Sequence, residues 1–499
     1  MVHPKSIITS FDLIIIGATG DLSTKKILPA LLKRYLDGQI PEKSKIYCIS
    51  RQSVSLDSFL KFLRKKLAPK NLTISQNKFS KFLSKINYIC LDVTDPNEHS
   101  IKLLKAHLKK SNNKIRLFYF ATAPELFGES AKVIKSNNLT NLKTRVIIEK
   151  PIGNDLFSAI KINNILNSCF EEKQIYRIDH YLGKETVQNL MVMRFANQIF
   201  ETHWSNNSIS NVQITVAEEK GIEGRELYYD AYGAIKDMIQ NHMLQLLCLV
   251  AMEPPSKFDA NLVRDEKLKV LLSLKTIDDH NDIALGQYGG RVENKKINTL
   301  SYLTDSKNSN SKTETFAALK VNIDNWRWAG VPFFLRTGKR LKKSASEIVI
   351  TFKPIRHFIF NKEVENSIQP NQLIIRLQPD EGLKVLLMSK EPGPGGIRIS
   401  PSYLNLSFSD AFKNRIPDAY ERLLMDVVRG NQTLFMRRDE VEAAWNWIDP
   451  IINKIKKHGI KPTVYESGSW GPKSSSKLID KYGFSWHEPD NLKGIQDEC

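Results

Sequence analysis

Residues 177–185 read R-I-D-H-Y-L-G-K-E and combine a carboxylate (Asp179), an imidazole (His180), a phenol (Tyr181) and an ammonium (Lys184). Burying so many polar groups without partners would cost several kcal/mol, so a plain core segment is not expected here. His180 and Lys184 are four residues apart and would share one face of a helix. A solvated loop with one satisfied histidine is the alternative. The whole cluster favours a site that holds a phosphate and moves a proton.

A second candidate site is the segment 17–23, which reads G-A-T-G-D-L-S between an expected strand and an expected helix. Its two glycines permit a tight turn and close approach of the backbone to a pyrophosphate, which the N–H groups of the helix N-terminus would bind. The segment departs from G-x-G-x-x-G, because Ser23 takes the third small position. Its members are Gly17, Ala18, Thr19, Gly20, Asp21, Leu22 and Ser23.

The end of the second expected strand bears on the choice of dinucleotide. An NAD site usually has an acid there to bind the ribose 2′-hydroxyl, whereas this chain has Arg51 after Ser50. An arginine suits a 2′-phosphate and predicts NADP. Taken alone, Arg51 could equally be an ordinary surface arginine.

Two further segments carry candidate residues. Lys150, within Glu149-Lys150-Pro151, ends a later expected strand and would point into the ligand crevice of a parallel sheet, unless it is a solvated charge. Residues 234–251 predict a helix whose apolar pattern is interrupted by Asp237, Asn241 and His242. Asp237 and His242 are five apart and share a face imperfectly. The residues alone do not decide whether His180 or His242 would be a base.

The expected elements divide the chain into two parts. Strand-like runs at 11–16, 46–49, 88–91, 117–120 and 145–148 alternate with helical patterns, which predicts an α/β domain with a parallel sheet covered on both faces. After residue 204, alternating runs at 212–217, 347–352, 373–377 and 384–388 predict a large sheet with helices on one side. The boundary is expected near Asp179, giving domains 1–178 and 179–499. Pockets are common at such junctions.

Composition narrows the class of protein. A chain of 499 residues is too long for one typical core. It contains no apolar stretch long enough for a membrane helix and no secretory signal is expected. The five cysteines are scattered without C-x-x-C, so neither a disulfide framework nor a metal site is predicted, and a reducing cytoplasm fits. The net charge of +19 comes with spread-out lysines and frequent Ile and Asn, which favours biased residue usage over a nucleic-acid surface.

Together the motifs resemble glucose-6-phosphate dehydrogenase, and the resemblance runs nearly end to end. It rests on residues 17–23, 149–153, 177–185, 237–242, 323–339 and 465–472, among which the string I-D-H-Y-L-G-K is highly specific. The resemblance implies an N-terminal Rossmann-like domain and a C-terminal β+α domain whose large, mainly antiparallel sheet forms a dimer interface, in a homodimer or homotetramer. It also implies oxidation of D-glucose 6-phosphate at carbon 1 by NADP to 6-phospho-D-glucono-1,5-lactone, the first step of the pentose phosphate pathway.

The resemblance also implies roles for individual residues. His242 matches the general base, and Asp179 matches the carboxylate that orients it. His180, Tyr181 and Lys184 match the residues that hold the substrate phosphate. The other substrate matches are Lys150, Glu218, Asp237 and Lys339, and the cofactor matches are residues 17–23, Arg51, Asp92, Val93 and Lys150.

One position departs from the family pattern. Many relatives carry a basic residue five positions after the match to Lys339, where this chain has Ser344. Lys342 and Lys343 are candidates to replace it, and the contact stays unassigned.

Two other functions compete with this interpretation. Another two-domain NADP-dependent sugar dehydrogenase would share the N-terminal domain, but residues 177–185 and 323–339 count against it. A basic nucleic-acid-binding protein would explain the charge, but no recognised nucleic-acid-binding module is present in the sequence.

Overall fold

The computed structural model describes residues 8–67, 76–111, 113–293, 296–360, 367–394, 396–411, 415 and 417–489; Cys499 and the start of the chain lie outside them. The chain forms two compact units. Unit 1 comprises Met1–Lys184, Pro255–Asp265 and Pro417–Glu442. Unit 2 comprises Glu185–Pro254, Glu266–Ile416 and Ala443–Cys499.

Unit 1 is built on a seven-stranded sheet in the order β17-β6-β5-β4-β1-β2-β3. Strands β1 to β6 are parallel, and the five expected apolar runs correspond to β1 to β5. Strand β6 was not among the expected runs, and β17 adds an antiparallel edge. The order 3-2-1-4-5-6 is that of a dinucleotide-binding sheet, with its topological switch between β1 and β4. The strands are β1 (Phe11–Ile16), β2 (Lys45–Ser50), β3 (Ile86–Cys90), β4 (Ile115–Phe120), β5 (Thr144–Glu149), β6 (Ile175–Ile178) and β17 (Phe435–Met436).

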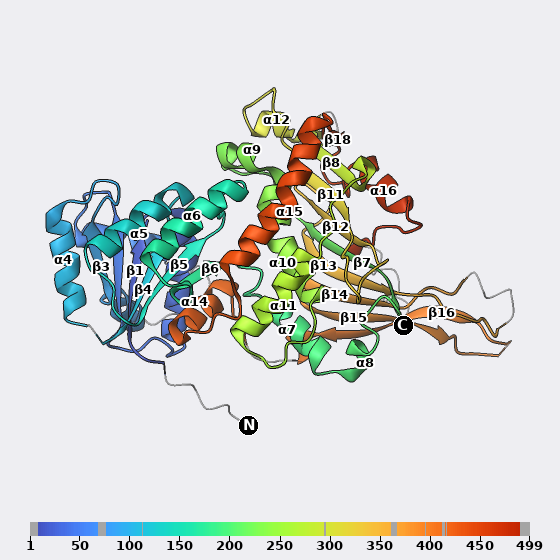
Figure 1. The fold of residues 1–499 in the computed structure, drawn as a ribbon, viewed down its shortest axis with the longest axis horizontal. Helices are drawn as coiled ribbons and strands as arrows, with labels where there is room; N and C mark the ends of the chain where they lie inside the picture. Colours follow the sequence, from blue (N-terminus) through green and yellow to red (C-terminus); the bar gives the residue numbers. More distant parts are fainter. Residues whose placement is uncertain are drawn as a thin grey trace. The chain divides into compact units, whose positions relative to one another are not determined.

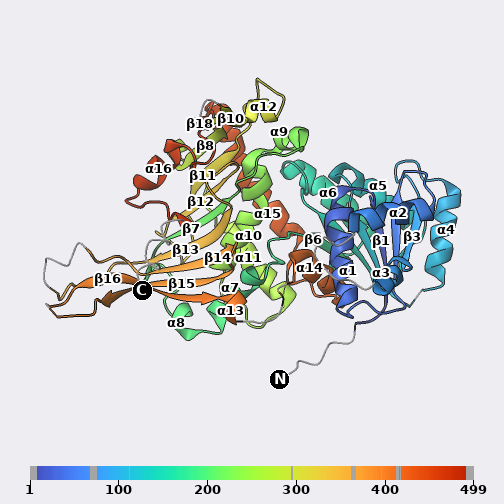
Figure 2. The same ribbon diagram turned by 180° about the vertical axis from the view of Figure 1, so that it is seen from behind.

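Helices cover both faces of this sheet. Helices α5 and α6 lie over one face in Figure 1, and α1 and α2 lie over the opposite face in Figure 2. Helix α14 comes from the late part of the chain and packs against α1 and β4. The helices are α1 (Leu28–Leu36), α2 (Leu56–Leu67), α3 (Gln76–Leu83), α4 (Glu98–Lys109), α5 (Phe127–Ser136), α6 (Leu156–Cys169) and α14 (Ala419–Arg429).

Unit 2 is built on a nine-stranded sheet in the order β16-β15-β14-β13-β7-β12-β11-β8-β18. Neighbouring strands are antiparallel except in the pairs β7–β12 and β8–β18, so the expectation of a mainly antiparallel sheet is confirmed. The strands are β7 (Ile209–Ala217), β8 (Ile283–Tyr288), β11 (Phe316–Val321), β12 (Phe333–Gly338), β13 (Ala345–Phe352), β14 (Gln372–Gln378), β15 (Gly382–Lys390), β16 (Ile399–Ser407) and β18 (Thr463–Tyr465). A hairpin of β9 (Arg291–Glu293) and β10 (Lys296–Thr299) stands apart from it.

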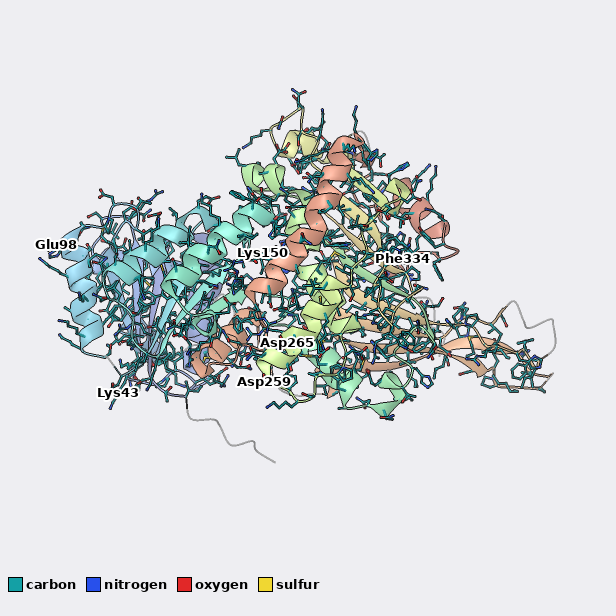
Figure 3. All side chains as sticks on the ribbon, viewed as in Figure 1. Lys43, Glu98, Lys150, Asp259, Asp265 and Phe334 are labelled. Carbon is teal, nitrogen blue, oxygen red and sulfur yellow. The ribbon has the colours of Figure 1, made fainter. Side chains whose placement is uncertain are left out.

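Adjacent residues of β12 show what covers each face of the large sheet. Phe333 packs edge-on against Trp328, whose indole N–H donates to the Ala251 carbonyl of the helical layer at 2.8 Å. Phe334, labelled in Figure 3, faces the other way and meets Phe484 and Trp486 of the C-terminal segment. The expectation of helices on one side was therefore incomplete, because this segment and helix α16 pack on the second face.

The helices of unit 2 are α7 (Glu185–Phe195), α8 (Gln198–Glu201), α9 (Glu226–Ala234), α10 (Leu244–Ala251), α12 (Tyr302–Asp305), α13 (Phe408–Ala411) and α16 (Lys473–Asp480). Helices α11 (Ala260–Leu272) and α15 (Arg438–Lys457) contain residues of both units. Within the part of the chain that the structure describes, none of the helices has the length and apolar composition needed to cross a membrane.

Candidate active site

The candidate site residues are divided between the two units. Unit 1 contains the loop after β1, Arg51, Asp92, Val93, Lys150 and the segment from Asp179 to Lys184. Unit 2 contains Glu218, Asp237, His242 and Lys339.

The loop after β1 has the form of a phosphate-binding turn. Gly17 has φ of 93°, and a Cβ there would lie 2.4 Å from the Ala121 carbonyl oxygen, so only glycine fits. Ser23 is buried and its hydroxyl donates to the Gly17 carbonyl at 2.9 Å, which holds the turn against the helix. The helix begins at Asp21, so its first N–H groups lie just beyond the carboxyl end of β1. The residues present therefore fit a dinucleotide pyrophosphate.

Arg51 and Asp92 occupy the ends of the neighbouring strands β2 and β3. Arg51 is exposed and follows β2 directly. The Asp92 carboxylate accepts hydrogen bonds from the Thr94 N–H at 2.9 Å and hydroxyl at 2.7 Å. These bonds, with a smaller contribution from the charge of Arg51, lower the pKa of Asp92. Val93 is buried beside them.

The segment from Asp179 to Lys184 links β6 to α7 and forms a turn, so His180 and Lys184 are not placed on one face of a helix. Successive backbone bonds join residues three apart, including Lys184 N–H to the Tyr181 carbonyl at 3.0 Å. Hydrogen bonds of this spacing place residues three apart, and not residues four apart, on the same side of the turn. The Lys184 ammonium accordingly lies 3.9 Å from the centre of the Tyr181 ring. His180 stacks at 6.3 Å on Tyr420 of α14, which fixes the plane of the imidazole.

Glu149 is a residue of this region that sequence reasoning missed, although it belongs to the Glu149-Lys150-Pro151 motif. Its carboxylate ends β5 and accepts hydrogen bonds from the phenols of Tyr119 and Tyr420. Burial raises the pKa of Glu149 to about 7, an effect that the two phenols and Lys150 only partly offset. Lys150, labelled in Figure 3, follows it at the carboxyl edge of the sheet. The sequence held no local signal for Glu149, because Tyr119 and Tyr420 come from distant parts of the chain.

In unit 2, Asp237 and His242 lie on a helical segment that differs from the expected α-helix. Residues Ile235–Met243 are π-helical and continue into α10. A π-helix closes its hydrogen bonds between residues five apart, which brings such residues closer to one face than an α-helix does. The spacing of Asp237 and His242 therefore suits a shared face here. Isolated π-helical turns are rare and occur frequently at functional sites.

Local hydrogen bonds hold the Asp237 side chain and the His242 backbone in place. The Tyr228 phenol donates to Asp237 Oδ1 at 3.3 Å. Burial, and then the charge of Asp237, raise the pKa of Tyr228, so the phenol keeps its proton. His242 is buried, and the Asn241 carboxamide accepts its backbone N–H at 2.7 Å.

Glu218 and Lys339 are brought together by the parallel pair β7–β12. Ala217 and Gly338 are register partners, so the next residue of each strand leaves the same edge of the sheet. The Lys339 ammonium donates to Glu218 Oε2 at 2.5 Å and lies 5.0 Å from the Tyr229 ring.

Ser344, the position that departs from the family pattern, has a local role. Its hydroxyl accepts the backbone N–H of Glu219 at 3.0 Å, next to Glu218. The serine therefore braces the strand end that carries Glu218. Which lysine replaces the basic residue of the relatives is not determined by this contact.

Comparison with known protein families covers nearly the whole chain. Residues 14–189 match the family described as glucose-6-phosphate dehydrogenase, NAD binding domain, and residues 191–487 match its C-terminal domain. The chain belongs to the glucose-6-phosphate dehydrogenase family. The family resemblance drawn from the sequence motifs is thus confirmed, as is the fold that it implied.

Individual relatives of the glucose-6-phosphate dehydrogenase family match over nearly their full length. The chain is 48% identical to the glucose-6-phosphate 1-dehydrogenase of Rhizobium meliloti (strain 1021), covering 96% of this chain and 98% of that protein. It is 45% identical to that of Mycolicibacterium smegmatis, covering 95% and 97%. A solved glucose-6-phosphate dehydrogenase in complex with glucose-6-phosphate has a TM-score of 0.89 at 36% identity, covering 97% of this chain and 100% of that one.

Proposed function

We propose that this chain oxidises D-glucose 6-phosphate at carbon 1 with NADP as the preferred acceptor, and that His242 is the general base. The glucose-6-phosphate 1-dehydrogenase activity follows from family membership, because relatives at 40–48% identity over the full length have it. The observation that supports the residue roles is the placement of each matched side chain at the end of a strand or on the π-helical segment.

The proton transfer is assigned to His242. A base must remove the proton of the carbon 1 hydroxyl while hydride leaves that carbon. The Asn241 carboxamide and the surrounding π-helical turn fix the backbone of His242. We assign Asp179 the role of orienting the imidazole and stabilising its protonated form. When bound, the nicotinamide of NADP supplies the hydride acceptor.

Recognition of the substrate is assigned to both units. His180, Tyr181 and Lys184 would hold the 6-phosphate, because they offer several donors on one short turn. Glu218, Asp237 and Lys339 would bind sugar hydroxyls. The pairing of Lys339 with Glu218 supports this role, because it places a hydrogen-bond donor and an acceptor for a hydroxyl side by side. Lys150 would contact substrate and nicotinamide.

The preference for NADP is argued from Arg51. The side chain is exposed at the end of β2, where a 2′-phosphate would extend from the adenosine ribose. Residues 17–23 would bind the pyrophosphate, and Asp92 and Val93 would complete the adenosine side.

We further propose a homodimer or homotetramer in the cytoplasm. The outer strands β15 and β16 present exposed leucines on one sheet face. Leu404 is 64% exposed, Leu406 is 47% exposed, and the register places Leu387 on the same face of the neighbouring strand. Contiguous exposed apolar residues are typical of an interaction surface.

A spectrophotometric assay tests the function. Reduced-cofactor absorbance is followed with glucose 6-phosphate and either NADP or NAD, for the wild type and Arg51→Ala. Loss of one charge-assisted contact of about 2 kcal/mol should weaken NADP roughly 30-fold, with NAD nearly unaffected. Equal losses for both nucleotides would refute the role of Arg51. Activity confined to a different sugar would favour another sugar dehydrogenase. Retention on nucleic acid without turnover would favour a nucleic-acid-binding protein.

A further inference from the structure

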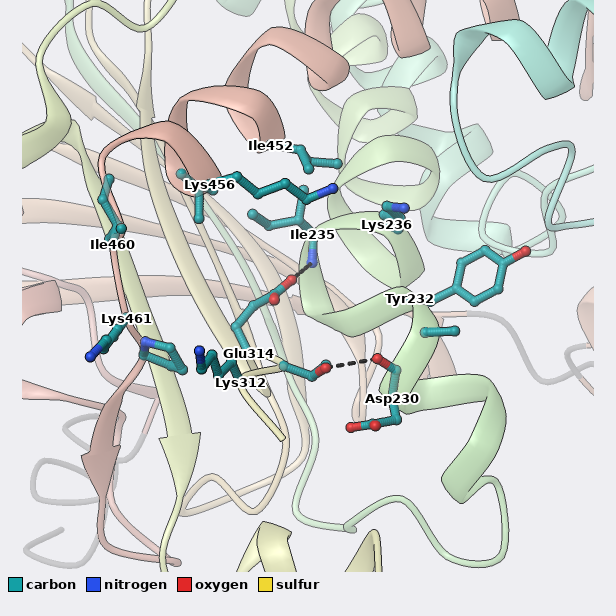
Figure 4. A pocket seen from close by; sticks show the side chains of 15 residues that line it. Asp230, Tyr232, Ile235, Lys236, Lys312, Glu314, Ile452, Lys456, Ile460 and Lys461 are labelled. Atoms are coloured by element: carbon teal, nitrogen blue, oxygen red, sulfur yellow. Dashed lines mark hydrogen bonds between the residues drawn. The ribbon is translucent and has the colours of Figure 1, made fainter. Parts of the chain in front are cut away.

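A cavity of ≈ 480 Å³ lies within unit 2, and none of its lining residues is among those assigned above. Three stretches of chain enclose it: the end of α15 with the residues after it, the end of α9 with the first turn of the π-helical segment, and the loop before β11 (Figure 4). Its volume falls in the range of about 300–1,000 Å³ that is typical of small-molecule sites. No role in the reaction has been assigned to its walls.

One side of the cavity is apolar. Ile452 and Ile455 of α15, Ile460 after it and Ile235 of the π-helical segment contribute to this wall. Tyr232 adds an aromatic ring at the rim (Figure 4). Such a wall suits the hydrocarbon or ring portion of a ligand.

The charged residues of the cavity are mostly basic. Lys456 and Lys461 line it from the end of α15 and the residues after it, and Lys312 lines it from the loop before β11. Among the described residues, none of these three lysines forms an ion pair or a side-chain hydrogen bond. The site therefore has several cations that the surrounding protein leaves uncompensated.

The two carboxylates of the cavity are already occupied by protein donors. Glu314 accepts the Ile235 N–H at 3.1 Å, the bond drawn in Figure 4. Asp230 accepts from the Tyr302 hydroxyl at 2.8 Å and from the Asn308 carboxamide at 2.9 Å. Neither carboxylate forms an ion pair with Lys312, Lys456 or Lys461 among the described residues. With Lys236, the lining has four lysines against two carboxylates, so it stays net basic.

We propose that this cavity binds a small organic phosphate, with the phosphate held by Lys312, Lys456 and Lys461 and the apolar body packed on the isoleucine wall. Lysine ammonium groups bind phosphate as compact point charges, and three of them from two segments hold one anion better than a single side chain. The apolar wall selects an organic phosphate over inorganic phosphate.

The position of the cavity would let a bound ligand influence the segment that carries Asp237 and His242. Ile235 and Lys236 directly precede Asp237 on the π-helical segment. Glu314 holds this turn through the Ile235 N–H, and its carboxylate fills the space beside Gly233, where a Cβ would lie 2.4 Å from Glu314 Oε1. A ligand on Ile235 and Glu314 would contact the turn that positions Asp237. We therefore infer that a ligand bound in the cavity changes the turnover number. This regulatory part rests on the proposed function, whereas the binding of the ligand is independent of it.

Titration with 1-naphthyl phosphate tests the binding, with its fluorescence as the readout. Inorganic phosphate and 1-naphthalenemethanol serve as probes that each lack one half of the ligand. Lys456→Ala should weaken binding about tenfold, the worth of roughly 1.4 kcal/mol. Lys457→Ala is the matched control, because it removes the same charge from the adjacent exposed position of α15 without touching the cavity.

The outcomes separate binding, regulation and the proposed function. Equal losses in Lys456→Ala and Lys457→Ala would mean general attraction to a basic surface and would overturn it. Displacement of the probe by NADP, with no effect of Lys456→Ala, would place the probe in the dinucleotide site and also overturn it. Saturating probe should change kcat several-fold in the wild type and in Lys457→Ala but not in Lys456→Ala, and this result would support the regulatory part. An unchanged kcat despite binding of the probe would refute that part. A His242→Ala variant of normal kcat would refute the proposed function and leave the binding result standing.

Discussion

A single carboxyl group, Glu149, should give the protein a measurable dependence of stability on pH. Its pKa is about 7 in the folded state because of burial, against 4.5 for an ordinary glutamate. The folded state keeps the proton that the unfolded chain releases, so this stabilisation is fully present below about pH 4.5 and is lost as pH rises through 7. Each pKa unit is about 1.4 kcal/mol, so the effect is a few kcal/mol at most.

Glu149→Gln removes this titration while keeping the shape of the side chain. We expect the free energy of unfolding of the wild type, relative to Glu149→Gln, to fall between pH 5 and 7.5 and then level off. Urea denaturation of both proteins across this range measures the difference. Asp426, whose pKa burial raises to about 6, titrates in both proteins and cancels. A difference that stays constant with pH would contradict the assignment.

The choice between two histidines is also a question at the scale of the residue. His242→Ala should lower kcat by roughly 10²–10⁴, the usual contribution of a general base, with little change in substrate affinity. Asp179→Asn should be impaired through the same imidazole. Steady-state kinetics of His242→Ala and His180→Ala test the assignment. Loss of kcat alone in His180→Ala, with loss of affinity alone in His242→Ala, would reverse the roles.

Lys184 tests recognition of the phosphate. Lys184→Ala would remove an ammonium worth about 1.5–3 kcal/mol against a phosphate, so kcat/KM for glucose 6-phosphate should fall by roughly 10- to 100-fold. Unphosphorylated glucose lacks that contact and should be used almost as before. The ratio of kcat/KM for the two sugars is the measurement, and Lys173→Ala, an exposed lysine in the same unit, is the control. An unchanged ratio would place the phosphate elsewhere.

At the scale of the element, the start of the π-helical segment depends on Gly233. Its φ of 66° and ψ of −178° suit glycine alone, and a Cβ would collide with the Glu314 carboxylate. Gly233→Ala should therefore lower the free energy of unfolding by about 2–3 kcal/mol and reduce kcat, because the turn before Asp237 moves. Gly224→Ala is the control, since it also has positive φ but no atom within 4 Å of the added Cβ. Similar kcat losses in both variants would argue against the clash.

The elements also show what could be predicted from the sequence. The buried strands β1 to β5 were predictable, because continuous apolar runs between turn residues identify parallel strands. The π-helical turn was not, since the apolar spacing near residue 240 does not distinguish bonds over four residues from bonds over five. What selects it includes Gly233 and its contact with Glu314, which come from distant parts of the chain. The turn after Asp179 was left open, because the spacing of His180 and Lys184 is compatible with a helix or a loop.

The site was predictable in a different sense. Its residue types pointed to phosphate and proton chemistry, but their roles came from matched family motifs. Glu218 and Lys339 carried no local signal, since only the parallel pairing of β7 and β12 brings them within 2.5 Å. Glu149 was passed over because its burial between Tyr119 and Tyr420 is a tertiary property.

At the scale of the whole molecule, the exposed leucines of β16 should govern assembly. Leu404→Glu would place a charge in the proposed subunit interface, at a cost of about 3 kcal/mol, and should raise the dissociation constant of the assembly roughly 100-fold. Light scattering during size exclusion gives the mass as a function of concentration. Leu142→Glu, at a fully exposed leucine of unit 1, should leave the mass unchanged. An unaltered mass in Leu404→Glu would move the interface to another surface.

The short strand β17 ties the completion of unit 1 to a late stage of translation. Strand β6 receives its outer neighbour from Phe435 and Met436, and helix α14 comes from the same late stretch. At about 5–20 residues per second, the ribosome would deliver that stretch roughly ten to fifty seconds after β6. During this interval the nascent chain exposes an unpaired apolar edge, which is a template for pairing with other chains. The yield of folded protein in the cell should therefore depend on chaperones that protect the nascent chain over this interval.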